Sequence, residues 1–118
     1  MTRIIVFGSN LHGIHGAGQA RDAYERYGAE WGIGAGRTGE CYAIPTKISP
    51  SERMPLVSIA GYVAVFLDYA RAHADLTFEV WRLGCGRAGY TDVQIAPMFK
   101  GAPSNCELPR GWRELSKA

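Results

Sequence analysis

Residues 81–90 read Trp81-Arg82-Leu83-Gly84-Cys85-Gly86-Arg87-Ala88-Gly89-Tyr90, and this glycine-rich stretch joins a predicted strand to a predicted helix. The strand is predicted over 76–81, where β-branched and aromatic residues are frequent, and the helix over 92–99. Glycines let backbone N–H groups turn toward a ligand, and a helix start adds unpaired donors and a partial positive charge. The stretch therefore indicates either an anion-binding loop or a tight turn without a ligand.

Another glycine-rich loop lies near the N-terminus, at residues 8–18, and contains four glycines. It follows a strand predicted over 3–7, whose consecutive apolar residues are typical of a strand covered on both faces. A helix is predicted over 18–27, and Gly28 is a natural stop for it. The loop is interpreted either as a set of backbone donors around a diphosphate or as a close-packed turn.

The rest of the chain alternates between predicted strands and helices. This alternation predicts an α/β fold with a mainly parallel sheet and helices on both faces. In such sheets ligands bind outside the carboxyl ends of the strands, so we expect the two glycine-rich loops to face each other across one crevice. The other predicted elements are strands over 41–46 and 104–109, a helix over 55–73, connections over 29–40 and 48–53, and a tail from 110 that Trp112 partly orders.

Length, net charge and cysteine spacing limit the classes of function that suit this chain. The 118 residues suit a single domain, 1–118. The net charge of +2 without a basic run argues against a nucleic-acid-binding surface. Three cysteines without metal-ligand spacing favour a reducing, cytoplasmic location. No stretch reaches the ~20 apolar residues of a membrane span, so we expect no membrane partner.

Two common nucleotide motifs do not fit this chain. Residues 34–39 match the dinucleotide fingerprint GxGxxG literally, but no predicted strand precedes them, and a strand rather than a helix follows. The Walker sequence, GxxxxGK followed by Ser or Thr, is absent. This removes the common nucleoside-triphosphate interpretation.

Several polar side chains near the two loops have more than one interpretation. The Asn10 amide suits a ribose hydroxyl, but asparagine is also a frequent turn former. His12 and His15 are candidates for a general base, for a turn-stabilising role or for contact with a ligand; no further ligands accompany them, so we expect no metal. Cys85 is interpreted as a nucleophile near a helix start or as a small buried filler.

Two arginines and two aromatic residues also remain open. Arg37 and Arg87 are interpreted as phosphate-binding or as solvated surface side chains. Trp31 and Tyr90 suit the flanks of an adenine or a ribose, and packing in the core or at its rim is the competing interpretation.

Three motifs together resemble the macrodomain family. The first ligand loop of that family is similar to Asn10-Leu11 followed by Gly16-Ala17-Gly18-Gln19-Ala20. The next conserved block of the family is similar to residues 39–46. Residues 82–86 resemble its phosphate-binding loop, especially in the compact branch related to terminal ADP-ribose glycohydrolases. The chain also resembles small macrodomain-like proteins of bacteria and phages, and the resemblance covers residues 3–108.

The resemblance implies a three-layer α/β/α macrodomain-like fold that binds ADP-ribose or a related NAD-derived nucleotide, without a cofactor. The diphosphate would lie between the two loops, and Asn10 would orient a ribose and, as the candidate catalytic residue, a water that attacks its anomeric carbon. An ADP-ribosylated protein or nucleic acid is the implied macromolecular partner. The expected ligand-binding residues are Asn10, His12, His15, Gly16, Ala17, Gly18, Thr46, Gly84, Cys85, Gly86, Arg87, Ala88, Gly89 and Tyr90.

Some members of the compact branch remove ADP-ribose with a lysine near the first helix and an aspartate directly after the second-loop glycines. Here the first helix carries Arg21 and Arg26, and Arg87-Ala88 stands where the aspartate would be.

Two alternatives to an ADP-ribose-binding module stay open. One is an enzyme that hydrolyses ADP-ribosylated macromolecules or an NAD-derived signalling nucleotide. Another is a structural or protein-interaction domain whose glycines only shape turns.

Overall fold

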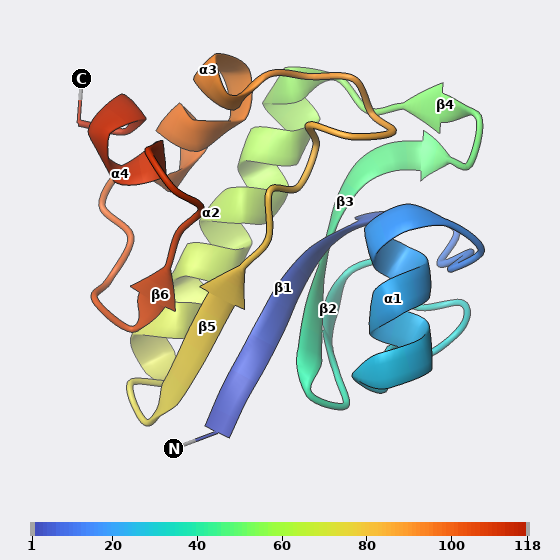
Figure 1. The fold of residues 1–118 in the computed structure, drawn as a ribbon, viewed down its shortest axis with the longest axis horizontal. Helices are drawn as coiled ribbons and strands as arrows, with labels where there is room; N and C mark the ends of the chain where they lie inside the picture. The colour runs from blue at the N-terminus through green and yellow to red at the C-terminus, as the bar shows by residue number, and fades with distance from the viewer. Residues whose placement is uncertain (1, 118) are drawn as a thin grey trace.

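The computed structural model describes residues 2–117, which form a six-stranded sheet with helices packed on it (Figure 1). The elements in chain order are β1 (Thr2–Asn10), α1 (Gly18–Arg26), β2 (Gly36–Thr38), β3 (Cys41–Ser49), β4 (Glu52–Arg53), α2 (Leu56–Ala72), β5 (Leu76–Val80), α3 (Asp92–Ile95), the 3₁₀ helix η1 (Ala96–Phe99), β6 (Cys106–Glu107) and α4 (Trp112–Leu115).

The sheet is mostly parallel, with the order β2-β3-β1-β5-β6. Strand β1 runs parallel to both β3 and β5, and β5 runs parallel to β6. The short strands β2 and β4 pair antiparallel with β3. Between Ser9 and Asn10 the register with β3 shifts, because these residues pair with Pro45 and Lys47 and leave Thr46 without an opposite Cα. The predicted α/β class with a mainly parallel sheet is confirmed.

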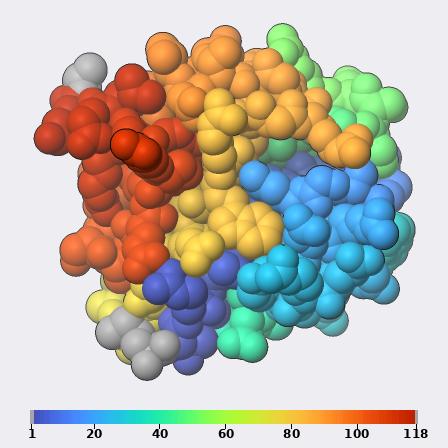
Figure 2. Space-filling view, viewed as in Figure 1, coloured from blue at the N-terminus to red at the C-terminus, as the bar shows by residue number. Residues whose placement is uncertain are grey.

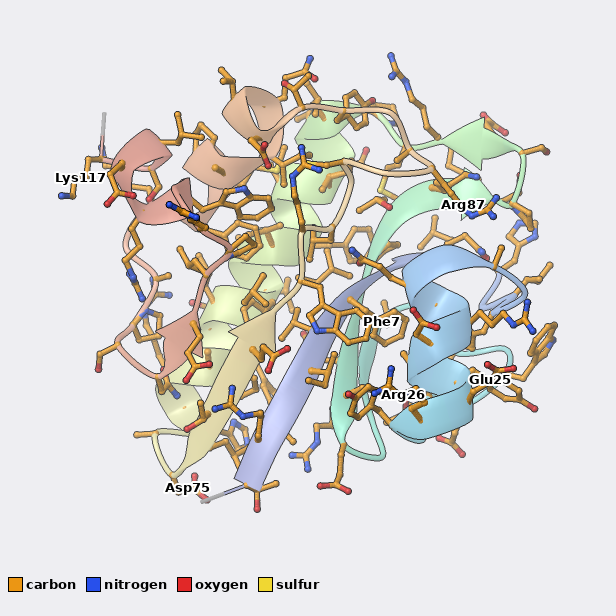
Figure 3. The ribbon with its side chains drawn as sticks, in the orientation of Figure 1. Phe7, Glu25, Arg26, Asp75, Arg87 and Lys117 are labelled. Carbon is orange, nitrogen blue, oxygen red and sulfur yellow. The ribbon has the colours of Figure 1, made fainter. Side chains whose placement is uncertain are left out.

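Both faces of β1 are covered, as its apolar run predicts. Successive side chains of a strand point to opposite faces, so Ile5 and Phe7 pack under α1 while Ile4 and Val6 belong to the larger cluster under α2. Figure 3 shows Phe7 between β1 and α1. Helices therefore lie on both faces of the sheet.

Membership of the macrodomain family stays a prediction.

Three elements were not predicted. Strands β2 and β4 lie in the segments 29–40 and 48–53, which were expected to be connections, and α4 lies in the tail. Each strand is very short and is held by pairing with β3 rather than by its own sequence. Short elements of this kind depend on tertiary partners that local propensity does not report.

Two predicted elements are shorter or less regular than expected. The helix expected over 92–99 is one α-helical turn, α3, followed by η1, which has Pro97 near its start. Proline lacks the N–H that a continuing α-helix would use. The strand expected over 104–109 pairs only at Cys106 and Glu107.

No helix within residues 2–117 has the length and apolar character needed to cross a membrane.

The core under α2 generates a stability prediction. Phe66 is 0% exposed, and its ring lies 5.0 Å from that of Tyr42 and 5.4 Å from that of Phe78. Replacing Phe66 with Ala should lower the free energy of unfolding by about 3–5 kcal/mol, because apolar contact is lost and a cavity is left. Urea denaturation measures this. The neighbouring Val65, 61% exposed, is the control, and a Phe66→Ala loss no larger than that of Val65→Ala would contradict this packing.

Candidate functional site

A cavity of about 450 Å³ lies at the carboxyl ends of β1 and β3. Two connections line it together with the start of α1. The N-terminal glycine-rich loop, called the first loop from here on, spans residues 11–17 in the structure, and the loop that follows β5, called the second loop, spans residues 81–91. In Figure 2 the orange second loop meets the blue N-terminal part of the chain at the surface. The lining residues are Gly8, Ser9, Asn10, Ile14, Gly16, Ala17, Gly18, Gln19, Ala20, Thr46, Lys47, Pro50, Gly84, Gly86, Arg87 and Ala88.

The strand order explains why a cavity forms at this edge. From β1 the chain passes through α1 to β3 on one side, and it later passes through α2 to β5 on the other side of β1. The loops that follow β1 and β5 therefore leave neighbouring strands in different directions, which opens a crevice at this switch point. Gly16 and Gly86 both line it, so the expectation that the two glycine-rich loops share one crevice is confirmed.

The Asn10 amide closes the first loop. Its Nδ2 donates to the carbonyl oxygen of Ile14 at 2.8 Å, and its Oδ1 accepts from the Ile14 N–H at 3.1 Å. The Gly13 N–H donates to the Asn10 carbonyl oxygen at 3.0 Å. Asn10 also lines the cavity, so it shapes the loop and reaches the candidate site at the same time.

The two loop histidines lie away from the cavity lining. His12 is exposed, whereas His15 is 1% exposed. The Nε2 of His15 lies 2.8 Å from the carbonyl oxygen of Glu30, which can only accept, so Nε2 carries the proton. The His15 ring packs near Phe7 and Trp31, with centroids 5.9 and 6.0 Å apart. His15 thus attaches the first loop to the segment 29–35.

Backbone packs directly on backbone beneath the first loop. A Cβ built on Gly34 would lie 2.2 Å from the carbonyl oxygen of Asn10, and one built on Gly13 would lie 2.2 Å from the carbonyl carbon of Gly32. The Gly32 N–H donates to the Gly13 carbonyl oxygen at 2.8 Å. Residues with side chains do not fit at these two contacts, so the glycines set the position of the loop.

Gln19, Gly8 and Lys47 line the cavity but were not among the expected ligand residues. Gln19 lies in the first turn of α1, and its Oε1 accepts from the Gly8 N–H at 2.8 Å. This bond ties the start of α1 to the end of β1. The position of Gln19 directly after Gly16-Ala17-Gly18 could have identified it as a lining residue from the sequence. Lys47 reaches the cavity through the register shift of β3, which the sequence does not reveal.

The second loop is held by two backbone hydrogen bonds. The Tyr90 N–H donates to the Gly84 carbonyl oxygen at 2.9 Å, and the Gly89 N–H donates to that of Gly86 at 3.0 Å. Gly84 has φ of +78°, and a Cβ there would lie 3.0 Å from Ile95 Cδ1. At Gly86, by contrast, an added Cβ meets nothing within 4 Å. The loop is tight at its base and open where it lines the cavity.

Tyr90 and Gly89 lie at the edge of this loop rather than in the cavity lining. The Tyr90 hydroxyl donates to the Met54 carbonyl oxygen at 2.7 Å, and the side chain is buried. The Arg53 guanidinium lies 4.3 Å from the centroid of the Tyr90 ring. Tyr90 therefore holds the loop against β4 and the chain that follows it, whereas Trp31 packs beside His15.

Positive charge borders the cavity. Among its lining residues within the described range 2–117, the charged ones are Lys47 and Arg87. The Arg87 side chain extends toward the start of α1, since its Cδ and Nε lie 3.2 Å from a Cβ built on Gly18 (Figure 3). The Lys47 ammonium donates to the Pro50 carbonyl oxygen. A cavity bordered by these cations favours an anionic ligand.

Cys85 faces Asp92 instead of the cavity. Its thiol donates to Asp92 Oδ1 at 3.7 Å. Burial, and then the negative charge of Asp92, raise the pKa of the Cys85 thiol to about 11. Hydrogen bonds from Arg82 and Trp112 lower the pKa of the Asp92 carboxyl to about 2. A thiol that stays protonated at neutral pH is a poor nucleophile.

The start of α3 lies outside the cavity lining. Thr91 and Gln94 form a capping box, in which the Gln94 Oε1 accepts from the Thr91 N–H at 3.0 Å. The side chains of Thr91 and Gln94 thus bond two backbone donors of the helix start that the sequence indicated as an anion site. No group of three or more His, Cys, Asp or Glu residues in the described chain is placed to hold a metal ion.

The glycine contacts under the first loop generate a second stability prediction. Gly34→Ala should lower the free energy of unfolding by about 1–3 kcal/mol, because the new methyl group overlaps backbone that must move. Gly16→Ala is the control, since its Cβ meets nothing within 4 Å. Denaturant titration of both variants measures the difference. Equal stability of the two would show that the backbone contact at Gly34 is looser than described.

The raised pKa of Cys85 predicts slow alkylation. Relative to a thiol at the ordinary value of 9.0, its thiolate fraction at pH 8 should be about a hundredfold lower. Mass spectrometry of Cys85 after timed iodoacetamide exposure across pH measures the rate, and the denatured protein is the control. A rate midpoint at or below pH 9 in the native protein would contradict the described environment.

Comparison of the chain with protein-family models, with curated proteins and with solved structures finds no match.

Proposed function

We propose that the cavity binds ADP-ribose or a related NAD-derived nucleotide, with the diphosphate between the first and second loops. The observation that carries this proposal is the meeting of Gly16 and Gly86 in one cavity, each with open space where a Cβ would be. Backbone without side chains allows phosphate oxygens to approach the N–H groups closely. The resemblance to macrodomains supports the same ligand class.

The start of α1 supplies donors for an anion. Its N-cap residue, Ala17, makes no side-chain capping bond, and its first turn holds no acidic residue. The first N–H groups of a helix have no partner within it, and the first residues of α1, Gly18 to Ala20, line the cavity. Together with Arg87, this end of α1 favours phosphate.

The remaining lining suits the other parts of a nucleotide. The volume of about 450 Å³ falls in the usual range for small-molecule sites. Apolar surface from Ile14, Pro50 and Ala88 suits the faces of a sugar or base. The Asn10 amide uses one donor and one acceptor position on Ile14, which leaves one of each for a ribose hydroxyl.

The described lining favours binding over hydrolysis. Among residues 2–117, those that line the cavity include no carboxylate, imidazole or thiol, which are the groups that most often act as a general base. Turnover through water held by Asn10 stays a prediction from the resemblance. Release of ADP-ribose from a modified protein or nucleic acid tests it, and Asn10→Ala should then lose turnover more than affinity.

A charge placed in the cavity tests the proposed binding. Gly86→Glu should weaken ADP-ribose binding by at least about a hundredfold, because the carboxylate fills the phosphate position and repels its charge. Gly61→Glu is the matched control: Gly61 is an exposed glycine of α2 that, like Gly86, has nothing within 4 Å of an added Cβ. Isothermal titration calorimetry measures both affinities.

Two results would contradict the proposal. One is the absence of detectable binding to the unaltered protein at millimolar ADP-ribose, and the other is an equal affinity of the Gly86→Glu and Gly61→Glu variants. A thermal-shift series with ADP-ribose, NAD, AMP and cyclic ADP-ribose ranks the ligands, because a ligand that binds only the native state raises the melting temperature.

A further inference from the structure

The two ends of the second loop are joined by a two-point ion pair. Arg82 Nε donates to Asp92 Oδ1 at 2.7 Å, and Arg82 Nη2 donates to Asp92 Oδ2 at 2.9 Å. All the second-loop residues that line the cavity lie between these two positions in the sequence. The pair therefore fixes the separation and the relative orientation of the two ends of the loop.

The same carboxylate connects the loop to the C-terminal helical turn. Trp112 Nε1 donates to Asp92 Oδ1 at 2.8 Å. Trp112 begins α4, is 1% exposed, and has its ring centroid 5.4 Å from that of Phe99. The next residue, Arg113, donates to the carbonyl oxygens of Pro103 and Cys106. Helix α4 is thus anchored to the body of the protein and presents a fixed donor to Asp92.

We propose that Arg82, Asp92 and Trp112 form a clasp whose task is to hold the second loop in its ligand-binding geometry. The three are positioning residues, since none of them lines the cavity. Through this clasp, α4 controls nucleotide affinity from outside the site, and this consequence rests on the proposed function. A loop held in place before binding loses less conformational freedom when the ligand arrives.

Solvent screening limits what this ion pair adds to overall stability. The side chains of Arg82 and Asp92 are 57% and 35% exposed, and exposed ion pairs contribute little to folding. The two hydrogen bonds from Arg82 and the third from the buried Trp112 indole fix the orientation of the Asp92 carboxylate.

The charge of Asp92 persists at working pH. The pKa of the Asp92 carboxyl is lowered to about 2. The stability that the ionised carboxylate contributes is therefore complete above the ordinary value of 3.8 and is lost only as pH falls through about 2. The clasp is therefore intact at neutral pH.

The experiment compares the unaltered protein with Asp92→Asn, which keeps the side-chain size and an acceptor for Trp112 but removes the charge. Hydrogen exchange of the ligand-free protein should show the Gly89 and Tyr90 amides exchanging about tenfold faster, while β1 amides do not change. The ADP-ribose dissociation constant should rise about tenfold as loop order is lost. Trp112→Phe should give the same loop-specific change in exchange.

Asp68→Asn is the matched control, because Asp68 is another exposed acid paired with an arginine, Arg71, at 3.1 Å. It should leave loop exchange and affinity unchanged. Faster loop exchange in Asp92→Asn supports the clasp even if the unaltered protein fails to bind ADP-ribose, a result that would overturn the proposed function instead. Unchanged Gly89 and Tyr90 exchange overturns the clasp. Equal acceleration of loop and β1 amides also overturns it, because the role would then be general stability.

Discussion

The rest of the structure depends on one constraint, the burial of β1 on both faces. Four consecutive apolar side chains alternate between two cores, so neither face can be left to water without losing burial that stabilises the fold. A helix must therefore cover each face, and the chain must pass to both sides of β1. The crevice at its carboxyl end is a geometric result of that covering.

Five of the residues that line the crevice are glycines, and contacts outside the lining help to fix its shape. The buried His15 ring and the close contact at Gly34 hold the first loop from outside the cavity lining, and the Asn10 amide closes the loop from within that lining. The second loop is held at its base by its own backbone bonds and by Asp92. Preformed donors of this kind bind an anion without first having to be ordered.

The elements with strong internal patterns were predictable from the sequence. The apolar run of β1 and the helical spacing of α2 specify burial without reference to distant residues. Strands β2 and β4 were not predictable, because they exist only by pairing with β3. Glycine loops at the ends of two strands identified the cavity, but the direction of each side chain did not follow: His15 turns to Glu30 and Cys85 to Asp92.

The register shift opposite Thr46 restricts how this protein can be altered. Pro45, which cannot donate to a ladder, is tolerated in an interior strand at such an irregularity. Removing Thr46 would leave Lys47 opposite Asn10, but it would delete the carbonyl oxygen that accepts from the Met54 N–H at 3.0 Å. Met54, which is buried beyond the hairpin, would lose this bond, and the cavity would lose Thr46 from its lining. New ligand preferences in this scaffold must therefore come from exchanging side chains at constant chain length, not from insertions or deletions in this strand.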